Sequence, residues 1–277
     1  MRFGFKLITV FCIAFMLNCP IVFSQEIGIQ LYSLREQFKQ DVPGTLKLIS
    51  SWGISKIEGG EDTYGVPEEE FVALLKKNGL DVVSVGTSFE ELQESPQKAL
   101  ARANTFDAKY IMCPWIPHDG NNFTIKDTKK AVKVFNETGA MLKAAGKELV
   151  YHAHGYEFRP YKGGTLFDYM VENALDFNFE MDVYWFAHGG ADPLQMLRKY
   201  PTKFKLMHLK DMAVGTVGDT SGHSDVETNV VLGTGSIDIK ALVTEGTRLG
   251  IKYMFIEDES SNVVTQVPKS LSFLMKL

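Results

Sequence analysis

The chain has 277 residues and a formal net charge of −5, with 45% hydrophobic and 23% charged residues. An acidic chain without a run of Lys or Arg argues against a nucleic-acid partner, because the neutralisation of phosphates dominates that affinity. The length is sufficient for one large domain with a single core or for two small domains.

Residues 1–24 are predicted to be an export signal that is removed. Arg2 and Lys6 form a short basic region, Leu7 to Leu17 an apolar region, and Val22-Phe23-Ser24 a small-residue cleavage pattern before Gln25. The apolar region is too short to span a bilayer. We therefore expect an exported, periplasmic protein without a stable membrane span.

The cysteines bear on the same prediction. Cys19 raises the alternative of a lipoprotein, although Asn18 before it is a poor fit to the small residue that such processing prefers. Loss of residues 1–24 removes Arg2 and Lys6, so the formal net charge of the remaining chain is −7 rather than −5. It also leaves Cys113 as a single cysteine, so no internal disulfide is expected and stability must come from the core.

From Glu26 onward, short apolar runs alternate with longer amphipathic runs, a pattern typical of parallel strands joined by helical crossovers. Strands are predicted at 27–32, 55–58, 80–85, 109–114, 148–151, 177–181, 204–207 and 252–256. Helices are predicted at 44–52, 67–77 and 94–105, in a long segment ending near 145, and at 166–173, 192–199, 237–249 and 263–277. Residues 211–235 show no usable period, and a loop of this length is usually functional or mobile, so we expect it to form a lid or rim over a pocket.

Eight strand–helix units within residues 25–277 predict a single domain that is a closed (β/α)8 TIM barrel. The main alternative is a doubly wound open sheet, which normally carries a Gly-rich phosphate loop after the first strand. Here the first strand runs into Tyr32-Ser-Leu-Arg-Glu36 instead. The barrel is therefore the favoured fold class, α/β.

In such a barrel the chemistry lies at the carboxyl ends of the strands, and polar residues collect there in this sequence. Residues two apart on a strand share a face, which pairs His152 with His154, Glu180 with Asp182, and His208 with Lys210. Two neighbouring carboxylates repel each other unless a cation is nearby. Imidazoles and carboxylates from several strands form the ligand set of a divalent ion such as Zn²⁺ or Mn²⁺.

The further residues that are expected to contact a substrate are Gln30, Tyr32, Glu58, Trp115 and Trp185, at or just beyond the strand ends. His118, His188 and His223 lie in predicted loops and are not expected to bind metal.

Stretches spread over residues 25–277 resemble the xylose isomerase-like TIM-barrel superfamily, the sugar phosphate isomerase/epimerase group. They are GIQLYSLRE, ISKIEGGEDTYG, YHAHGYEF, FEMDVYWFAHGGADP, HLKDM, GTGSIDIKAL and YMFIEDE. Their order and spacing together are specific for the superfamily but not for the substrate.

The resemblance implies a divalent metal ion, Mn²⁺, Zn²⁺ or Mg²⁺, held by Asp182, His208 and Glu257. On the fifth strand, His152 occupies the position where many relatives carry Glu. In family epimerases, a pair of metal-bound glutamates exchanges the proton next to a carbonyl, and this chain keeps only Glu257 of that pair. The second acid or base would be one of His154, Glu157, Glu58 and Lys210.

These residues predict a metal-dependent isomerase or epimerase that acts on a carbohydrate or cyclic polyol by proton abstraction next to a carbonyl. A lyase or hydrolase that cleaves 3-keto-glycosides is the close alternative, and a non-catalytic sugar-binding barrel is another. The export signal favours free sugars or glycosides over phosphorylated intermediates. The sequence does not predict the oligomeric state.

Overall fold

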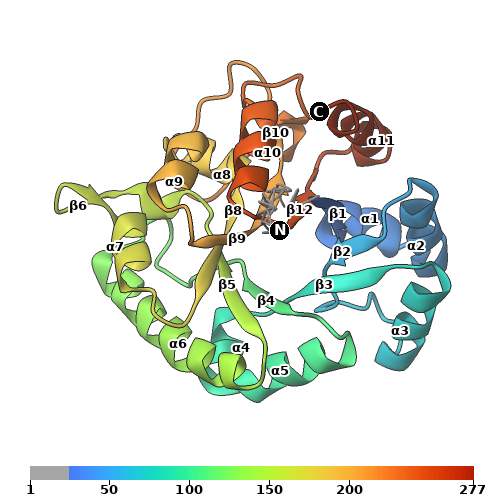
Figure 1. The fold of residues 1–277 in the computed structure, drawn as a ribbon, viewed down its shortest axis with the longest axis horizontal. Coiled ribbons are helices and arrows are strands. Elements are labelled where there is room, and N and C mark those ends of the chain that lie inside the picture. The colour runs from blue at the N-terminus through green and yellow to red at the C-terminus, as the bar shows by residue number, and fades with distance from the viewer. Residues whose placement is uncertain (1–24) are drawn as a thin grey trace, which may run out of the picture.

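The computed structural model describes residues 25–277, and the export-signal prediction for residues 1–24 lies outside that range. Eight parallel strands close into a barrel, in the order β1-β12-β9-β8-β5-β4-β3-β2 (Figure 1). The predicted TIM barrel is therefore confirmed. The barrel strands are β1 (Glu26–Gln30), β2 (Lys56–Glu58), β3 (Asp81–Gly86), β4 (Tyr110–Cys113), β5 (Glu148–His152), β8 (Asn178–Asp182), β9 (Phe204–Leu209) and β12 (Tyr253–Ile256).

Helices surround the barrel, as Figure 1 shows. They are α1 (Arg35–Phe38), α2 (Val42–Ser51), α3 (Glu68–Lys77), α4 (Phe89–Glu94), α5 (Pro96–Thr105), α6 (Ile125–Ala144), α7 (Leu166–Asn173), α8 (Val183–His188), α9 (Pro193–Lys199), α10 (Ile239–Arg248) and α11 (Val263–Leu274). The 3-10 helices are η1 (Leu31–Leu34), η2 (Tyr156–Phe158) and η3 (Val226–Thr228). Short strands outside the barrel are β6 (Pro160–Tyr161), β7 (Gly164–Thr165), β10 (Asp211–Met212) and β11 (Asn229–Val230).

The predicted start of the third helix is wrong. Residues 94–105 were expected to be one helix, but the chain forms α4 and α5, separated at Ser95, whose φ is −151°. Pro96 explains the break, because a proline ring disfavours the helical conformation of the residue before it. Pro96 then occupies the first turn of α5, where its missing N–H costs nothing.

Two separate apolar layers hold the barrel together. The large core lies between the strands and the helices, and a small cluster comprises Val83, Met112, Val150, Leu206 and Phe255. The small cluster draws its residues from five barrel strands, as the side-chain layers inside a TIM barrel do. Gly28 on β1 makes room for it, since a Cβ there would lie 2.6 Å from Phe255 Cδ1.

Residues two apart on a barrel strand point to the same face, so the residues that follow the small cluster also point into the barrel. Val150 and His152 lie two apart on β5, Leu206 and His208 two apart on β9, and Phe255 and Glu257 two apart at the end of β12. The apolar residue of each pair fills the barrel, and the polar residue lies one layer higher, at the carboxyl end.

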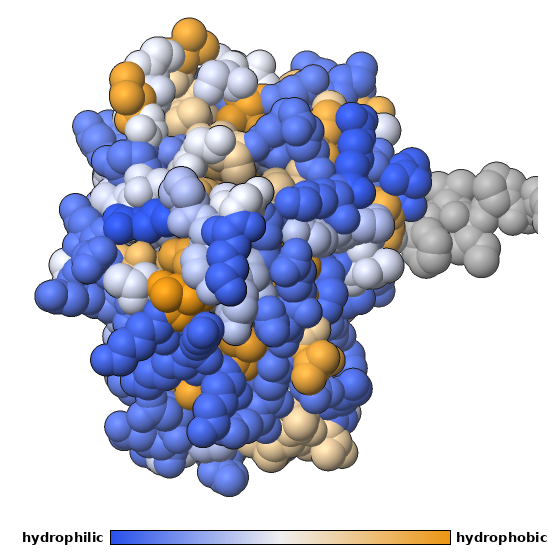
Figure 2. All heavy atoms as spheres, turned by 90° about the vertical axis from the view of Figure 1, so that its left-hand side faces the viewer, coloured by the Kyte–Doolittle hydropathy of each residue, from blue (hydrophilic) through white to orange (hydrophobic). Residues whose placement is uncertain are grey.

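The outer surface is mainly hydrophilic on the face that Figure 2 shows, with hydrophobic residues in small, scattered groups. Among residues 25–277, none of the helices combines the length and apolar character that crossing a membrane requires.

Candidate active site

A cavity of about 490 Å³ opens at the carboxyl ends of the barrel strands. Its wall includes residues from the ends of β1, β4, β5, β9 and β12 and from the loop after β9. The lining residues are Gln30, Tyr32, Glu61, Met112, Pro114, Trp115, His152, His154, Trp185, His208, Gly222, His223, Ser224, Val226, Glu257 and Glu259.

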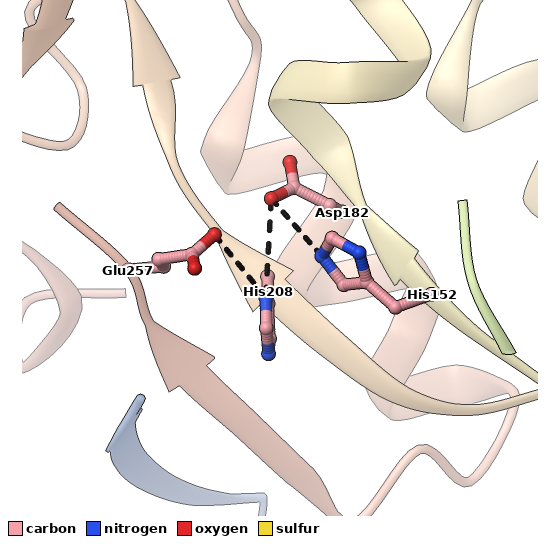
Figure 3. Close-up of side chains that lie close together, drawn as sticks. All are labelled: His152, Asp182, His208 and Glu257. Atoms are coloured by element: carbon pink, nitrogen blue, oxygen red, sulfur yellow. Dashed lines mark ion pairs between the residues drawn. The ribbon is translucent and has the colours of Figure 1, made fainter. Parts of the chain in front are cut away.

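Four side chains converge at this cavity: His152, Asp182, His208 and Glu257 (Figure 3). They come from β5, β8, β9 and the end of β12, and one ligand atom from each lies within 4.8 Å of the others. Asp182 Oδ2 is 3.4 Å from His152 Nε2 and 3.9 Å from His208 Nδ1, and Glu257 Oε2 is 3.3 Å from His208 Nδ1. The structure thus brings together the four residues for which a metal role was predicted. We call them the quartet.

The quartet fits a divalent ion. His152 Nε2, Asp182 Oδ2 and His208 Nδ1 are buried without a hydrogen-bond partner, and each is the atom that faces the common point. Buried polar atoms are rarely left unpaired unless a bound group supplies the partner. Ligand atoms around a tetrahedral Zn²⁺ with bonds of about 2.0–2.1 Å lie roughly 3.3 Å apart. The quartet distances of 3.3 and 3.4 Å match that spacing, and the third, 3.9 Å between Asp182 Oδ2 and His208 Nδ1, is somewhat longer.

Two of the metal-facing groups, His208 and Asp182, are also held from behind. His208 Nε2 lies 2.6 Å from Glu58 Oε1 and 3.2 Å from Glu180 Oε1, and Gln30 Nε2 donates to Glu58 Oε1 at 2.8 Å. A carboxylate on the far nitrogen of a histidine fixes the orientation of the ring and raises its basicity towards a metal. Asp182 uses its other oxygen, Oδ1, to accept hydrogen bonds from the backbone N–H groups of the first turn of α8.

The protonation states suit this arrangement at two of the ligands. Burial, and then the neighbouring His208, lower the pKa of His152 to about 3, so its imidazole is neutral and able to bind a cation. Burial raises the pKa of Glu257, but Lys210 and His208 outweigh burial and hold it well below its ordinary range. Glu257 is therefore an anionic ligand.

Negative charge exceeds positive charge around His208. Burial lowers the pKa of His208, but the facing carboxylates of Glu180, Glu257 and Glu58 outweigh burial and hold it well above its ordinary value. Burial also raises the pKa of Asp182 to about 7 and that of Glu180 to about 8. Buried carboxylates in such numbers require a compensating positive charge, which a divalent ion would supply.

Lys210 is the buried lysine of this region. Its Nζ lies 3.2 Å from Glu257 Oε2 and 2.5 Å from Glu259 Oε1. It also sits 5.4 Å from the centres of the Tyr184 and Trp185 rings. With 1% of its side chain exposed and outside the cavity wall, Lys210 positions Glu257 rather than contacting a substrate.

The predicted substrate contacts divide into two groups. Gln30, Tyr32, Trp115 and Trp185 line the cavity, as does His154. Glu58 does not, because it lies beneath the quartet and contacts His208, so it orients that ring instead of binding substrate.

Glu157 is also placed differently from the prediction. It is fully buried outside the cavity, where Oε1 accepts hydrogen bonds from the Tyr151 hydroxyl and from His154 N. The chain turns at Gly155, with φ +92°, and this turn directs Glu157 back under the loop. The structure therefore places Glu157 against the Tyr151 hydroxyl and the His154 backbone, outside the cavity wall, and its predicted part in proton transfer stays a prediction.

Sequence reasoning missed several wall residues. Glu61 and Glu259 each lie three residues past the ends of β2 and β12, just beyond the strand-end positions that the barrel rule selects. His223 belongs to the aperiodic loop and packs 5.6 Å from the Trp115 ring centre. Residues 222–226 reach the cavity, so the loop forms part of its rim. No sequence signal within the loop marked which of its residues would do so.

No protein-family model matches the chain. Among curated proteins, an inosose dehydratase of Clostridium perfringens is 24% identical over 155 residues, which are 53% of this chain and 43% of that protein. This chain thus spans less than half of the curated relative that it matches.

Solved structures are similar over nearly the whole chain. A sugar phosphate isomerase/epimerase from Parabacteroides distasonis has a TM-score of 0.74 and 25% identity, covering 92% of this chain and 99% of that one. The IolI protein, solved with a bound zinc atom, has a TM-score of 0.72 at 13% identity, covering 91% and 97%. The second likeness is one of fold alone. Together with the closed barrel, the sequence and structure similarities confirm the resemblance of this chain to the xylose isomerase-like TIM-barrel superfamily, the sugar phosphate isomerase/epimerase group.

Proposed function

We propose that this protein is a metal-dependent enzyme that removes a proton next to a carbonyl of a carbohydrate or cyclic polyol. The observation that carries the proposal is the quartet, whose His152, Asp182 and His208 present three buried, unpartnered ligand atoms to one point beside a cavity. A divalent ion bound there polarises a carbonyl or hydroxyl oxygen and makes the neighbouring C–H acidic.

The protein itself supplies the groups that move the proton. Glu257 is anionic and lines the cavity. Of the four residues predicted as the second acid or base, His154 alone lines the cavity. Burial, and then His152, lower the pKa of His154 to about 3, so its imidazole is neutral, which is the form that a general base requires. Its Nδ1 is 3.3 Å from His152 Nδ1, which places it next to the quartet.

Isomerisation or epimerisation follows when the proton returns to a carbon atom, and a lyase reaction follows when a β-substituent leaves. In the second case, the C–H electron pair forms a carbon–carbon double bond as the β C–O bond breaks, and the leaving oxygen takes up a proton. The similarity to an inosose dehydratase favours this lyase chemistry as the second candidate. Its substrates would be the 3-keto-glycosides of the alternative drawn from the sequence. The predicted export, which we also propose, favours free sugars or glycosides.

The test is proton exchange with solvent. The purified protein is incubated in D₂O with Mn²⁺, Zn²⁺ or Mg²⁺ and a panel of free, phosphorylated and 3-keto sugars, and products are followed by NMR and mass spectrometry. We expect metal-dependent deuterium incorporation next to a carbonyl in the isomerase case, and release of a β-substituent in the lyase case. An apo protein as active as the metal-loaded one would contradict the proposal.

Variants separate the metal ligand from the base. His208→Ala should lose stoichiometric metal and activity together. His154→Gln should keep the metal and lose activity by about 10²-fold or more. The matched control is Glu137→Gln, an exposed position on α6 that should change neither quantity. Tight sugar binding without any turnover in the metal-loaded protein would instead indicate a non-catalytic binding barrel.

A further inference from the structure

A second cavity of about 440 Å³ lies beside the first. It lies over the ends of β3 and β4 and the start of α4, whereas the quartet comes from β5, β8, β9 and β12. The residues that line it are Glu61, Gly86, Thr87, Ser88, Phe89, Glu90, Glu91, Arg102, Met112, Pro114 and Trp115. None of the residues with a proposed role in proton transfer belongs to it.

The two cavities share the wall made by Glu61, Met112, Pro114 and Trp115. Glu61 lies across the end of β3, where its Oε2 accepts a hydrogen bond from Gly86 N at 3.2 Å. Gly86 permits this close approach, because a Cβ there would lie 2.5 Å from Glu61 Cδ. The two cavities therefore adjoin at Trp115, which places the second cavity next to the one that the quartet faces.

Each cavity alone has a volume in the range of about 300–1,000 Å³ that is usual for small-molecule sites. A single sugar ring needs only the first. The second cavity is thus surplus to the reaction on one ring and is suited to a second ring joined to it.

The charges of the cavity walls disfavour a phosphate group as the part of the substrate that would lie in the second cavity. Among the described residues that line the two cavities, the one Lys or Arg is Arg102. Its guanidinium donates to both oxygens of Glu91 at 2.8 Å and to Gly86 O at 2.9 Å, which neutralises its charge. Glu61 and Glu90 add negative charge to the same wall. An anionic ligand would meet net repulsion there.

We propose that the substrate is an uncharged two-ring glycoside, with the reacting sugar ring at the quartet and the second ring in the cavity between α4 and Trp115. The second ring is a sugar or an aryl group, since the wall offers both carboxylate acceptors and the apolar surfaces of Phe89, Met112 and Trp115. This inference rests on the proposed function and adds its substrate class.

The test is calorimetric binding to the metal-loaded protein. The probes are methyl β-glucoside for one ring, cellobiose, maltose and phenyl β-glucoside for two, and glucose 6-phosphate for the charged ligand, together with their 3-keto forms. We expect a two-ring probe to bind at least about tenfold more tightly than the one-ring probe, and the phosphate to bind no better than the one-ring probe. Tighter binding of cellobiose or maltose than of phenyl β-glucoside would assign a sugar to the second cavity. Tighter binding of phenyl β-glucoside would assign an aryl group to it.

A matched pair of variants locates the second ring. Glu90 is exposed at the second cavity, and Glu94 is exposed on the same helix outside it. Glu90→Trp should remove the two-ring advantage and leave one-ring affinity unchanged, whereas Glu94→Trp should leave both affinities unchanged. Equal binding of one-ring and two-ring probes, or an undiminished two-ring advantage in Glu90→Trp, would overturn the inference while metal-dependent one-ring binding still supported the proposed function. If no probe binds to the metal-loaded protein, both fail.

Discussion

Two members of the quartet, Asp182 and His208, are each held by the protein on one side and face the common point on the other. Asp182 Oδ1 accepts hydrogen bonds from the N-terminus of α8, and Oδ2 has no hydrogen-bond partner. His208 Nε2 contacts Glu58, and Nδ1 has no hydrogen-bond partner. A side chain anchored in this way needs little reorganisation when an ion binds. We therefore expect Glu58 to influence metal affinity although it does not reach the cavity.

Glu157 permits a test of positioning against catalysis. Burial raises its pKa from an ordinary value of 4.5 to about 7, although hydrogen bonds from Tyr151 and backbone N–H groups lower it. A carboxyl whose pKa is higher in the folded chain binds more protons when folded, so its stabilising contribution is full below pH 4.5 and is lost as pH rises through 7. Its Oε1 takes both hydrogen bonds and Oε2 has none, so Gln would keep them.

We therefore expect Glu157→Gln to be as stable as the wild type near pH 4.5 and more stable above pH 7, by on the order of 2 kcal/mol. Urea unfolding at a series of pH values measures the difference, with Glu137→Gln, on the surface of α6, as control. Turnover should stay within about tenfold of wild type, because Glu157 lies outside the cavity. A loss of turnover at unchanged stability would restore the catalytic role.

At the scale of elements, one carboxylate joins the start of the loop after β9 to its end. Asp211 accepts hydrogen bonds from four backbone N–H groups, those of Met212, Gly233, Gly235 and Ile237. The loop closes with its two ends joined at β10 and β11 and sends residues 222–226 to the cavity. Its anchoring therefore bears directly on substrate affinity.

Asp211→Asn replaces one acceptor oxygen by a donor and should lose two of these four bonds, at a cost of about 1–3 kcal/mol. We expect faster hydrogen exchange of the amides of residues 213–235, measured by mass spectrometry, and a higher KM with a smaller change in kcat. Asp225→Asn, in the same loop, keeps a carbonyl oxygen that can accept the one side-chain hydrogen bond from Glu227 N–H, so it should have little effect. Equal exchange in both variants would show that Asp211 does not hold the loop.

The strands were more predictable than the segments between them. All eight barrel strands lie within a few residues of their predicted positions, because buried parallel strands are continuous apolar runs bounded by turns. The short helices α4 and α8 were missed, since six residues give too little periodicity to detect. The strand-end rule placed the quartet among the candidate site residues, and the resemblance to the superfamily singled out Asp182, His208 and Glu257 as ligands. Glu157 and His223 lie in irregular backbone whose direction no sequence pattern specifies.

At the scale of the whole molecule, the quartet joins four strands that are consecutive around the barrel: β5, β8, β9 and β12. Without an ion, burial and then neighbouring carboxylates raise the pKa values of Asp182 and Glu180, so the charged forms of these groups are unfavourable in the folded chain. An ion that binds only the folded chain should therefore stabilise the whole domain. The chain has no disulfide among residues 25–277 that would compensate for its loss.

At a free metal concentration of a hundred times Kd, the linkage gain is about 2.7 kcal/mol. For a domain of this size, each kcal/mol moves Tm by roughly 2–4 °C, so we expect metal to raise Tm by about 5–10 °C and chelation to reverse the shift. His152→Ala removes one ligand and should abolish most of the shift. His223→Ala, a histidine of the same cavity outside the quartet, should retain it. An equal shift in both variants would mean that the stabilising ion binds elsewhere, and that strand β5 contributes no ligand.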